Sequence, residues 1–320
     1  MSPTPAKPTC RPSKGSRLVA ETARDAAGQI VESHAALTKE SSLAPSASVN
    51  AILSSLVKLC SEIHDHNTVD LILQDERVTS ILPELRRFCA ESEFLLERHW
   101  AEWVQSDEAS DLIPDPWDRL CKFPYYSNYV ELVRIELAAL FTVLPSAPTR
   151  IAYVGSGPMP LTSICITLAL TGGGGSPWGA WDGPPAPLEV LNIDCDDDAL
   201  RLSREMARQL GLTGQGMGFA RADAKDFDLD LSGYQVVYLA ALVGSTNEEK
   251  ERCIVNVASR MDPGAVILTR SAWGLRKCLY PELQISRPAL LQCLDICLVV
   301  HPYGAVVNSV MVARVKGRHA

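Results

Sequence analysis

The feature that most constrains the fold is a change of hydrophobic period near residue 150. Residues 150–154, Arg-Ile-Ala-Tyr-Val, form a short apolar run that ends in Gly155-Ser-Gly157, and a helical pattern follows over 161–170. A strand, a glycine turn and a helix in this order are typical of a parallel sheet with crossover helices. The residues before this unit show a different pattern, whereas the residues after it repeat the alternation of strand and helix.

Strands alternate with helices downstream of this unit. Further predicted strands are apolar and β-branched: 189–193, 235–239, 265–268, 291–300 and 305–315. Helical patterns separate the earlier ones: 199–210 and 248–261. The alternation predicts an α/β domain with a doubly wound parallel sheet over residues 146–320, closed by an antiparallel edge pair.

The period is helical upstream of residue 146. Apolar residues recur at three and four positions in 49–60, 81–89 and 129–144, which predicts an all-helical domain over residues 21–145. Residues 1–20 hold several prolines among Ser, Thr and Lys and are expected to be a disordered tail. Residues 171–187 are rich in Gly and Pro, which predicts a flexible insertion in the sheet domain.

Charge and apolar content exclude several function classes. The net charge is −8 and no run of five Lys or Arg occurs, so a nucleic-acid or anionic-membrane partner is not expected. No apolar run approaches the roughly 20 residues needed to cross a bilayer, and no signal-peptide core precedes Leu43. We therefore expect a cytoplasmic protein that acts on a small molecule.

The cysteines and histidines do not predict a metal site. Ten cysteines are scattered without a CxxC pair, which argues against a disulfide framework or structural zinc. Cys293 and Cys297 are expected to be buried, reduced thiols one helical turn apart. His64 and His66 have no third ligand in view, so a solvated helix end is the favoured interpretation.

A ligand pocket is expected at the carboxyl ends of the predicted strands, where parallel sheets bind ligands. Gly155, Ser156, Gly157 and Pro158 follow the first strand, and a glycine turn there lets backbone amides approach a polar ligand. Pro160 replaces the third glycine of a dinucleotide fingerprint and crowds the space of a pyrophosphate. The turn therefore favours a compact nucleoside such as S-adenosylmethionine over NAD.

Two aspartates support a nucleoside pocket. Asp194 ends the second strand, where a carboxylate can bind both ribose hydroxyls, and the 171–187 insertion explains its late position. Asp223 falls near the end of a third strand, where adenine is read. The alternative is that both aspartates only cap the following helices. Small residues after the fourth strand leave room for the ligand: Ala240, Ala241 and Leu242.

Several segments together resemble nicotianamine synthases of the fungal, plant and archaeal type. The matching segments are Val154-Gly-Ser-Gly-Pro-Met-Pro-Leu-Thr-Ser163, Asn192-Ile-Asp-Cys-Asp196, Leu239-Ala-Ala-Leu-Val-Gly244, Arg270-Ser-Ala-Trp-Gly-Leu-Arg276 and Leu279-Tyr-Pro281, with Leu95-Leu-Glu97 and Phe123-Pro-Tyr-Tyr-Ser-Asn-Tyr129 in the helical half. The resemblance spans about residues 50–315. The tail and the insertion are not part of it.

The resemblance implies a helical domain that covers a Rossmann-like sheet of the class I methyltransferase type. It also implies a reaction in which an acceptor amine attacks the γ-carbon of the methionine moiety of S-adenosylmethionine and releases methylthioadenosine. Three donors then give nicotianamine, a metal chelator. The sulfonium is already a good leaving group, so the chemistry needs an aligned, deprotonated amine and no metal.

The resemblance also assigns the side chains that meet the acceptor. It implies that Glu97 is the catalytic base and that Tyr129, with Tyr126 behind it, lines the acceptor cavity. Glu93 is a weaker candidate for binding the acceptor. Arg270 could bind a substrate carboxylate through its guanidinium, and a structural pair with an aspartate is an equal alternative. From spacing alone, Glu93 and Glu97 could equally lie on a solvated helix face with Glu91.

Two other functions stay open at this point. A small-molecule methyltransferase on the same sheet would release S-adenosylhomocysteine in place of methylthioadenosine. A nucleoside-sensing protein would bind the donor without turnover. The oligomeric state is open between a monomer and a homodimer.

Overall fold

The computed structural model describes residues 14–172 and 187–317, and the predictions for the remaining residues of the tail and the insertion lie outside this range. Within it, seven helices precede the first strand: α1 (Lys14–Lys39), α2 (Ala47–Ser61), α3 (His66–Leu73), α4 (Glu76–Gln105), α5 (Asp107–Leu112), α6 (Pro116–Leu120) and α7 (Tyr126–Phe141). The expected tail is wrong for residues 14–20, which belong to α1.

Short polar side chains cap the amino-terminal ends of α2, α3 and α4. Ser46, Asp65 and Asp75 accept hydrogen bonds from the first free backbone amides of α2, α3 and α4. His66 opens α3 and is exposed, as expected for a solvated helix end. His64 departs from that expectation, because only 13% of its side chain is exposed.

The sheet has seven strands in the described part of the chain, in the order β3-β2-β1-β4-β5-β7-β6. The strands are β1 (Arg150–Val154), β2 (Glu189–Asp194), β3 (Met217–Arg221), β4 (Val236–Leu239), β5 (Val266–Ser271), β6 (Leu294–Val300) and β7 (Ser309–Val315). β1 to β5 are parallel, whereas β7 runs antiparallel to both β5 and β6. The predicted doubly wound sheet and its antiparallel edge pair are confirmed.

Helices cover both faces of the sheet because side chains alternate along each strand. The following helices complete the α/β region: α8 (Leu161–Thr171), α9 (Asp197–Gln209), α10 (Asn247–Ala258) and α11 (Pro288–Cys293). Tyr153 points to the face covered by α7 and α8, and Ala152 points to the face covered by α10 and α11. Because α11 occupies 288–293, the strand expected over 291–300 begins only at Leu294, three residues later than predicted.

Because α11 ends at Cys293, the expectation that Cys293 and Cys297 are buried one helical turn apart is wrong. Cys293 ends α11 and is half-buried, and Cys297 lies on the edge strand β6 with its side chain exposed. A helix–strand junction separates them, so they are not one turn apart on a helix. No disulfide joins the described cysteines.

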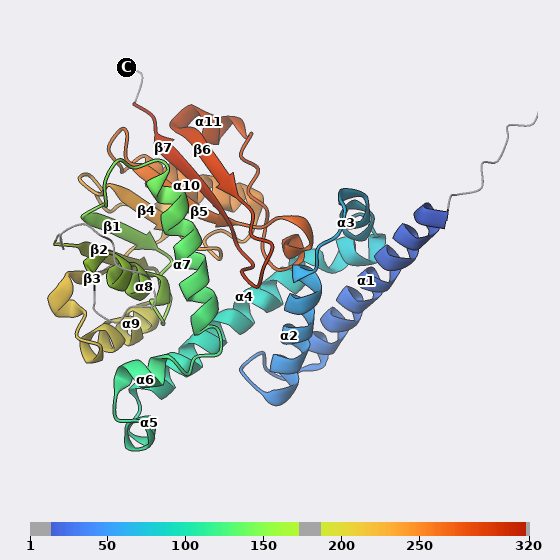
Figure 1. The fold of residues 1–320 in the computed structure, drawn as a ribbon, viewed down its shortest axis with the longest axis horizontal. Helices are drawn as coiled ribbons and strands as arrows, with labels where there is room; N and C mark the ends of the chain where they lie inside the picture. The colour runs from blue at the N-terminus through green and yellow to red at the C-terminus, as the bar shows by residue number, and fades with distance from the viewer. Residues whose placement is uncertain (1–13, 173–186, 318–320) are drawn as a thin grey trace, which may run out of the picture.

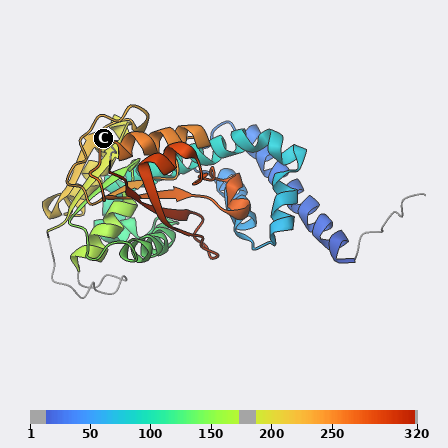
Figure 2. The ribbon, with the colours of Figure 1, turned by 90° about the horizontal axis from the view of Figure 1, so that it is seen from above.

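The long helix α4 connects the two ends of the molecule. Figure 1 shows α1, α2 and α3 beside the sheet, with α4 running from this group to α5 and α6, and Figure 2 shows the elongated arrangement from above. One end of α4 packs against α1, and the other packs against α9. Its middle therefore passes the carboxyl ends of the central strands.

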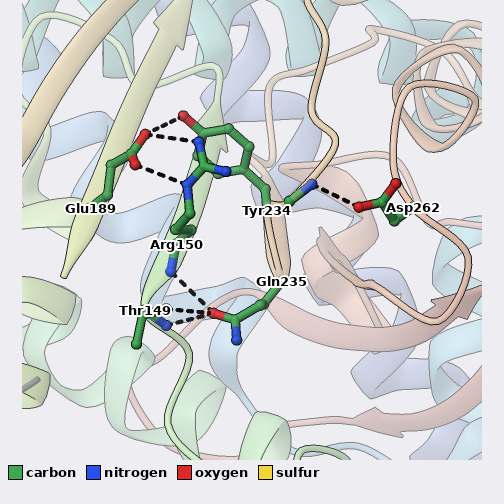
Figure 3. Close-up of polar contacts among 7 residues, drawn as sticks. Thr149, Arg150, Glu189, Tyr234, Gln235 and Asp262 are labelled. Carbon is green, nitrogen blue, oxygen red and sulfur yellow. Dashed lines mark hydrogen bonds and ion pairs between the residues drawn. The ribbon is translucent and has the colours of Figure 1, made fainter. Parts of the chain in front are cut away.

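Polar contacts near the surface join the amino ends of the parallel strands β1, β2 and β4 (Figure 3). We call this side of the sheet the amino edge, and the side where these strands end the carboxyl edge. Arg150 Nε donates to Glu189 Oε2 at 2.9 Å and thereby joins the starts of β1 and β2. Tyr234 Oη donates to Glu189 Oε1 at 2.5 Å, and its ring lies under the Arg150 guanidinium at 4.3 Å. These contacts fix the register of the strands whose other ends form the cavity described below.

Two further contacts complete this edge. The side-chain oxygen of Gln235 accepts from the amides of Thr149 and Arg150, next to the start of β4. Asp262 Oδ2 accepts from the amide of Gly233 at 2.7 Å, as Figure 3 shows. Arg150 and Glu189 keep about two fifths of their side-chain surface exposed, at 41% and 45%, so this pair lies near solvent.

Candidate active site

Two cavities meet at the middle of α4. The sheet-side cavity, of about 440 Å³, lies at the carboxyl ends of β1, β2 and β4. The helix-side cavity, of about 500 Å³, lies among α2, α4, α7 and residues 305–308. The two cavities share three lining residues, Glu93, Glu97 and Tyr129.

Most of the predicted site residues line the sheet-side cavity. They are Glu93, Glu97, Tyr129, Gly155, Ser156, Gly157, Asp194, Asp223, Ala240, Ala241, Leu242 and Arg270. Pro158 and Tyr126 do not line either cavity. The ring of Tyr126 instead packs between the sheet face and the cluster around α6, and its expected place at the acceptor is wrong.

The glycine turn after β1 brings backbone and carboxylate close together. Gly155 and Gly157 have φ angles of 81° and 65°, a region that favours glycine. A Cβ on Gly155 would lie 2.5 Å from Val243, and one on Gly157 would lie 3.0 Å from Glu97 Oε2. Any larger residue at position 157 would therefore push into the shared wall of the two cavities.

Asp194 supports this turn from the end of β2. Its Oδ2 accepts from the amide of Gly157 at 2.8 Å, and its Oδ1 accepts from the amide of Asp196 at 3.0 Å. Each carboxylate oxygen has a second lone pair available for a ligand hydroxyl. The helix-cap alternative is wrong for Asp194, because Asp196 caps α9.

Asp223 does cap the short 3₁₀ helix at Ala224–Asp226, where its Oδ1 accepts from the amide of Lys225. It also lines the sheet-side cavity, so the cap and a ligand contact are compatible. Ser156 offers a further group, because its buried hydroxyl has no partner within the described residues. The cavity thus presents two carboxylates and a hydroxyl to a polar ligand.

A buried lysine shapes the loop after β4. Lys250 Nζ donates to the carbonyl of Ala241 at 2.8 Å and lies 3.3 Å from the carbonyls of Ala240 and Val243. Its side chain is fully buried, and burial lowers its pKa to about 7. The sequence analysis did not identify it, because a lysine on an amphipathic helix is ordinarily a solvated residue.

Glu97 stands at the shared wall with a hydrogen bond from Tyr129. The Tyr129 hydroxyl donates to Glu97 Oε1 at 2.6 Å. Burial, followed by the nearby Glu93 carboxyl, raises the pKa of Glu97 to about 8, and burial also holds the pKa of Tyr129 well above its usual range. The remaining accessible surface of Glu97 faces the cavities, so this carboxyl can exchange a proton with a bound group near neutral pH.

Glu93 forms a second carboxyl–phenol pair one turn earlier on α4. Its Oε2 accepts from the Tyr280 hydroxyl at 2.7 Å, and burial raises its pKa. Glu91, in contrast, is exposed and pairs with Arg87. The solvated-face alternative therefore holds for Glu91 and is wrong for Glu93 and Glu97.

Arg270 is anchored by a buried ion pair. Its Nε donates to Glu136 Oε1 at 2.7 Å, and its Nη2 donates to Glu136 Oε2 at 3.2 Å and to Thr162 Oγ1 at 2.7 Å. Glu136 is fully buried on α7. The structural partner of Arg270 is thus a glutamate, not an aspartate, and Arg270 also lines the sheet-side cavity, so the carboxylate-binding alternative stays open.

Sequence reasoning missed three residues at this site. Tyr280 lay inside a recognised segment, Leu279-Tyr-Pro281, which was its only signal. Glu136 lies among apolar residues of α7, where an isolated acid at a core position could have prompted a search for a cation. Lys250 left no comparable signal.

The arrangement can align two ligands on either side of one carboxyl group. The sheet-side cavity offers paired carboxylates and backbone amides, as a nucleoside requires. The helix-side cavity is mostly apolar and meets it at Glu97. Among residues 14–172 and 187–317, no group of three His, Cys, Asp or Glu side chains could hold a metal ion, and no helix there has the length and apolarity to cross a membrane.

Comparisons with known proteins agree with this geometry. A family model described as "Nicotianamine synthase protein" matches residues 21–320. The chain is 35% identical over 285 residues to nicotianamine synthase 3 of Oryza sativa subsp. indica, covering 88% of this chain and 75% of the relative. It is 34% identical over 289 residues to nicotianamine synthase 1 of Arabidopsis thaliana, covering 90% and 83%.

Two solved structures of MtNAS share the fold. A mutant of that protein in complex with S-adenosylmethionine aligns with a TM-score of 0.67 and 22% identity over 93% of this chain and 98% of the other. MtNAS in complex with MTA and tNA aligns with a TM-score of 0.66 and 22% identity over 96% and 100%.

Proposed function

The chain belongs to the nicotianamine synthase family, and from this premise we propose that it transfers aminopropyl (aminocarboxypropyl) groups from S-adenosylmethionine to an amine acceptor. Three donor molecules give nicotianamine, and each transfer releases methylthioadenosine. The relative MtNAS, which shares the fold, has been solved with S-adenosylmethionine and with MTA and tNA. The product is a metal chelator, so its formation would serve metal homeostasis.

The observation that supports this proposal best is the place of Glu97 between the two cavities. The acceptor amine attacks the γ-carbon of the donor, the carbon–sulfur bond breaks, and its electron pair remains on the sulfur of methylthioadenosine. The amine must lose one proton. A free α-amine has a pKa near 8, and the pKa of Glu97 is also about 8, so proton transfer between them is nearly balanced.

The sheet-side cavity is the proposed donor site. Asp194 would bind the ribose hydroxyls with its free lone pairs, and Asp223 would lie at the adenine end. The backbone after Gly155 and the small residues Ala240 and Ala241 leave room for the nucleoside. These contacts bind the donor and orient its γ-carbon toward the shared wall.

The helix-side cavity is the proposed acceptor site. Tyr129 would hold Glu97 in place and contact the acceptor, and Glu93 would attract an ammonium group of the acceptor. Arg270 lies on the sheet-side cavity, where it would bind a substrate carboxylate only with the part of its guanidinium that Glu136 and Thr162 leave free. The fixed position of Arg270 favours one orientation of such a carboxylate.

The organisation of the chain supports further proposals. Helices before residue 146 would act as a lid over the donor site, although α7 itself packs on the sheet. The many cysteines without disulfide spacing favour a reducing compartment, so we place the enzyme in the cytoplasm. A homodimer is a proposal that sedimentation of the purified protein would test.

Mass spectrometry of the purified protein incubated with S-adenosylmethionine alone tests the function. We expect methylthioadenosine and nicotianamine to accumulate together. Formation of S-adenosylhomocysteine instead would favour the methyltransferase alternative and contradict the proposal. Stable binding without any nucleoside product would indicate a sensing protein.

A further inference from the structure

Two buried polar side chains of the helix-side cavity have no hydrogen-bond partner. Ser92 is 3% exposed and Asn308 is 8% exposed, and neither the Ser92 hydroxyl nor the Asn308 side-chain nitrogen has a partner among the described residues. Buried polar groups in folded proteins are nearly always hydrogen-bonded. Both side chains line the helix-side cavity, so a ligand in it could supply the missing partner.

The helix-side cavity is lined by carboxyl groups but not by long basic side chains. Glu93 and Glu97 line it, whereas no lysine or arginine is among its described lining residues. A bound α-amino acid carries both an ammonium and a carboxylate group. The two glutamates can face the ammonium, but the carboxylate must then be met by neutral donors, because an unpaired charge in an apolar cavity is strongly disfavoured.

One donor lies on a helix and the other lies next to a strand. Ser92 follows Cys89 and precedes Leu96 on the face of α4 that lines the cavity, at the three- and four-residue spacing of one helix side. Asn308 directly precedes β7, whose first residue, Ser309, pairs with Ser271 of β5. Neither group needs to move a loop to be presented to a ligand, which reduces the entropic cost of binding.

The other walls of the cavity are largely apolar. Leu53, Leu96, Leu132 and Val306 are among them, and they suit the methylene chain of an aminocarboxypropyl unit. The cavity therefore combines acidic residues at the shared wall, apolar walls and two neutral donors. An acceptor with an amine, a methylene chain and a carboxylate matches this set of groups.

We propose that Asn308 and Ser92 bind a carboxylate of the acceptor and so select acceptors that carry an amino acid group over simple amines. This inference rests on the proposed function. It adds the side chains that read the acceptor by hydrogen bonds to a carboxylate in a cavity without a cation. Such bonds to a charged group are the strong class of hydrogen bond.

The test measures binding of nicotianamine and of methylthioadenosine by calorimetry, with the wild type and with the variants Asn308→Leu and Ser92→Ala. We expect each variant to bind nicotianamine at least about tenfold more weakly and methylthioadenosine as the wild type does. Ser55→Ala is the matched control, because Ser55 is an exposed serine of α2 that lines neither cavity, and this variant should bind both ligands normally.

Asn308→Asp keeps the size of the side chain and adds a negative charge, so it should bind nicotianamine more weakly still. Nicotianamine binding within twofold of the wild type in both Ser92→Ala and Asn308→Asp would overturn the inference, even if Asn308→Leu fails to fold. Failure of the proposed function has a different signature, because the wild type itself would then form no nicotianamine from S-adenosylmethionine.

Discussion

The two edges of the sheet carry similar sets of side chains with opposite properties. At the amino edge, Glu189 is surrounded by Tyr234 and Arg150, as Figure 3 shows. At the carboxyl edge, Glu97 accepts from Tyr129, and the Arg270 guanidinium lies 5.9 Å from the Tyr129 ring. Each edge thus combines a glutamate, a tyrosine and an arginine.

Burial and the partner of the arginine explain the difference. Arg150 binds Glu189 directly near solvent and lowers the pKa of that carboxyl. Arg270 is instead committed to Glu136, so Glu97 is left with a phenol, and burial raises its pKa to about 8. A glutamate among the same types of neighbour therefore has a lowered pKa in one place and a raised pKa in the other, as the proposed role of Glu97 as a base requires.

Replacement of the two glutamates by glutamine should give the largest contrast. Glu97→Gln removes the base but preserves shape, so we expect turnover to fall by about 10²-fold or more while donor affinity is kept. Glu189→Gln should leave turnover within about twofold. Methylthioadenosine release under saturating donor measures both, and a Glu97→Gln activity within threefold of the wild type would show that the carboxylate is dispensable.

Removal of the negative charge that holds Arg270 should make the pKa of Glu97 more like that of Glu189. Glu136→Gln leaves a buried arginine without its anionic partner, and we expect a loss of about 3–5 kcal/mol in the free energy of unfolding. The freed positive charge would also favour ionised Glu97, so the activity profile should move to lower pH. Unchanged stability together with an unchanged profile would contradict the account of Arg270 given above.

Two aspartates offer the next comparison, since each accepts from a glycine amide. Asp194 binds Gly157 at the carboxyl edge, and Asp262 binds Gly233 at the amino edge. Asp194→Ala should weaken binding of S-adenosylmethionine and methylthioadenosine alike, by about 1.5–3 kcal/mol if the lost ribose bonds are charge-assisted. Asp262→Ala is the control and should leave both affinities unchanged. Equal affinities in the wild type and Asp194→Ala would move the donor site elsewhere.

The pH dependence of stability should have opposite signs at the two edges. Glu97 keeps a proton in the folded state between pH 4.5 and about 8 that the unfolded state has lost, so its contribution to stability falls as pH rises through this window. Glu97→Gln should therefore gain stability relative to the wild type, by about 3–5 kcal/mol at pH 8, and less at pH 5.

Glu189 behaves in the opposite way, because its lowered pKa stabilises the fold above the unfolded value and loses that effect in acid. The group is close to solvent, so Glu189→Gln should cost no more than about 1 kcal/mol at pH 7, and this cost should shrink as the pH falls below 4.5, the ordinary pKa of the carboxyl. Denaturant titrations at several pH values measure both variants. If the stability difference from the wild type changed with pH in the same direction for both variants, the contrast between the two glutamates would be refuted.

The sequence predicted one half of the site better than the other. Gly155, Asp194 and Ala240 follow strands, and the topology of a parallel sheet brings strand ends together whatever the loops do. No comparable rule of topology brings together the residues that line the helix-side cavity. Ser92, Tyr280 and Asn308 come from distant segments, and only the packing of the helices against residues 279–308 decides which of their side chains meet. Glu97 and Tyr129 were found through resemblance, because spacing alone left Glu97 on a solvated face.

The smallest expected effect is that of metal removal. The sulfonium of the donor supplies the leaving group and Glu97 accepts the proton, so no step of the proposed reaction requires a Lewis acid. We expect full activity after exhaustive dialysis against a strong chelator. The measurement must separate bound metal from bound product, since nicotianamine itself chelates metal through its amines and carboxylates. Metal that leaves together with nicotianamine agrees with the prediction. Activity that falls on chelation and returns with zinc or magnesium would contradict it, and the acidic residues at the shared wall would then have to be reconsidered as ligands.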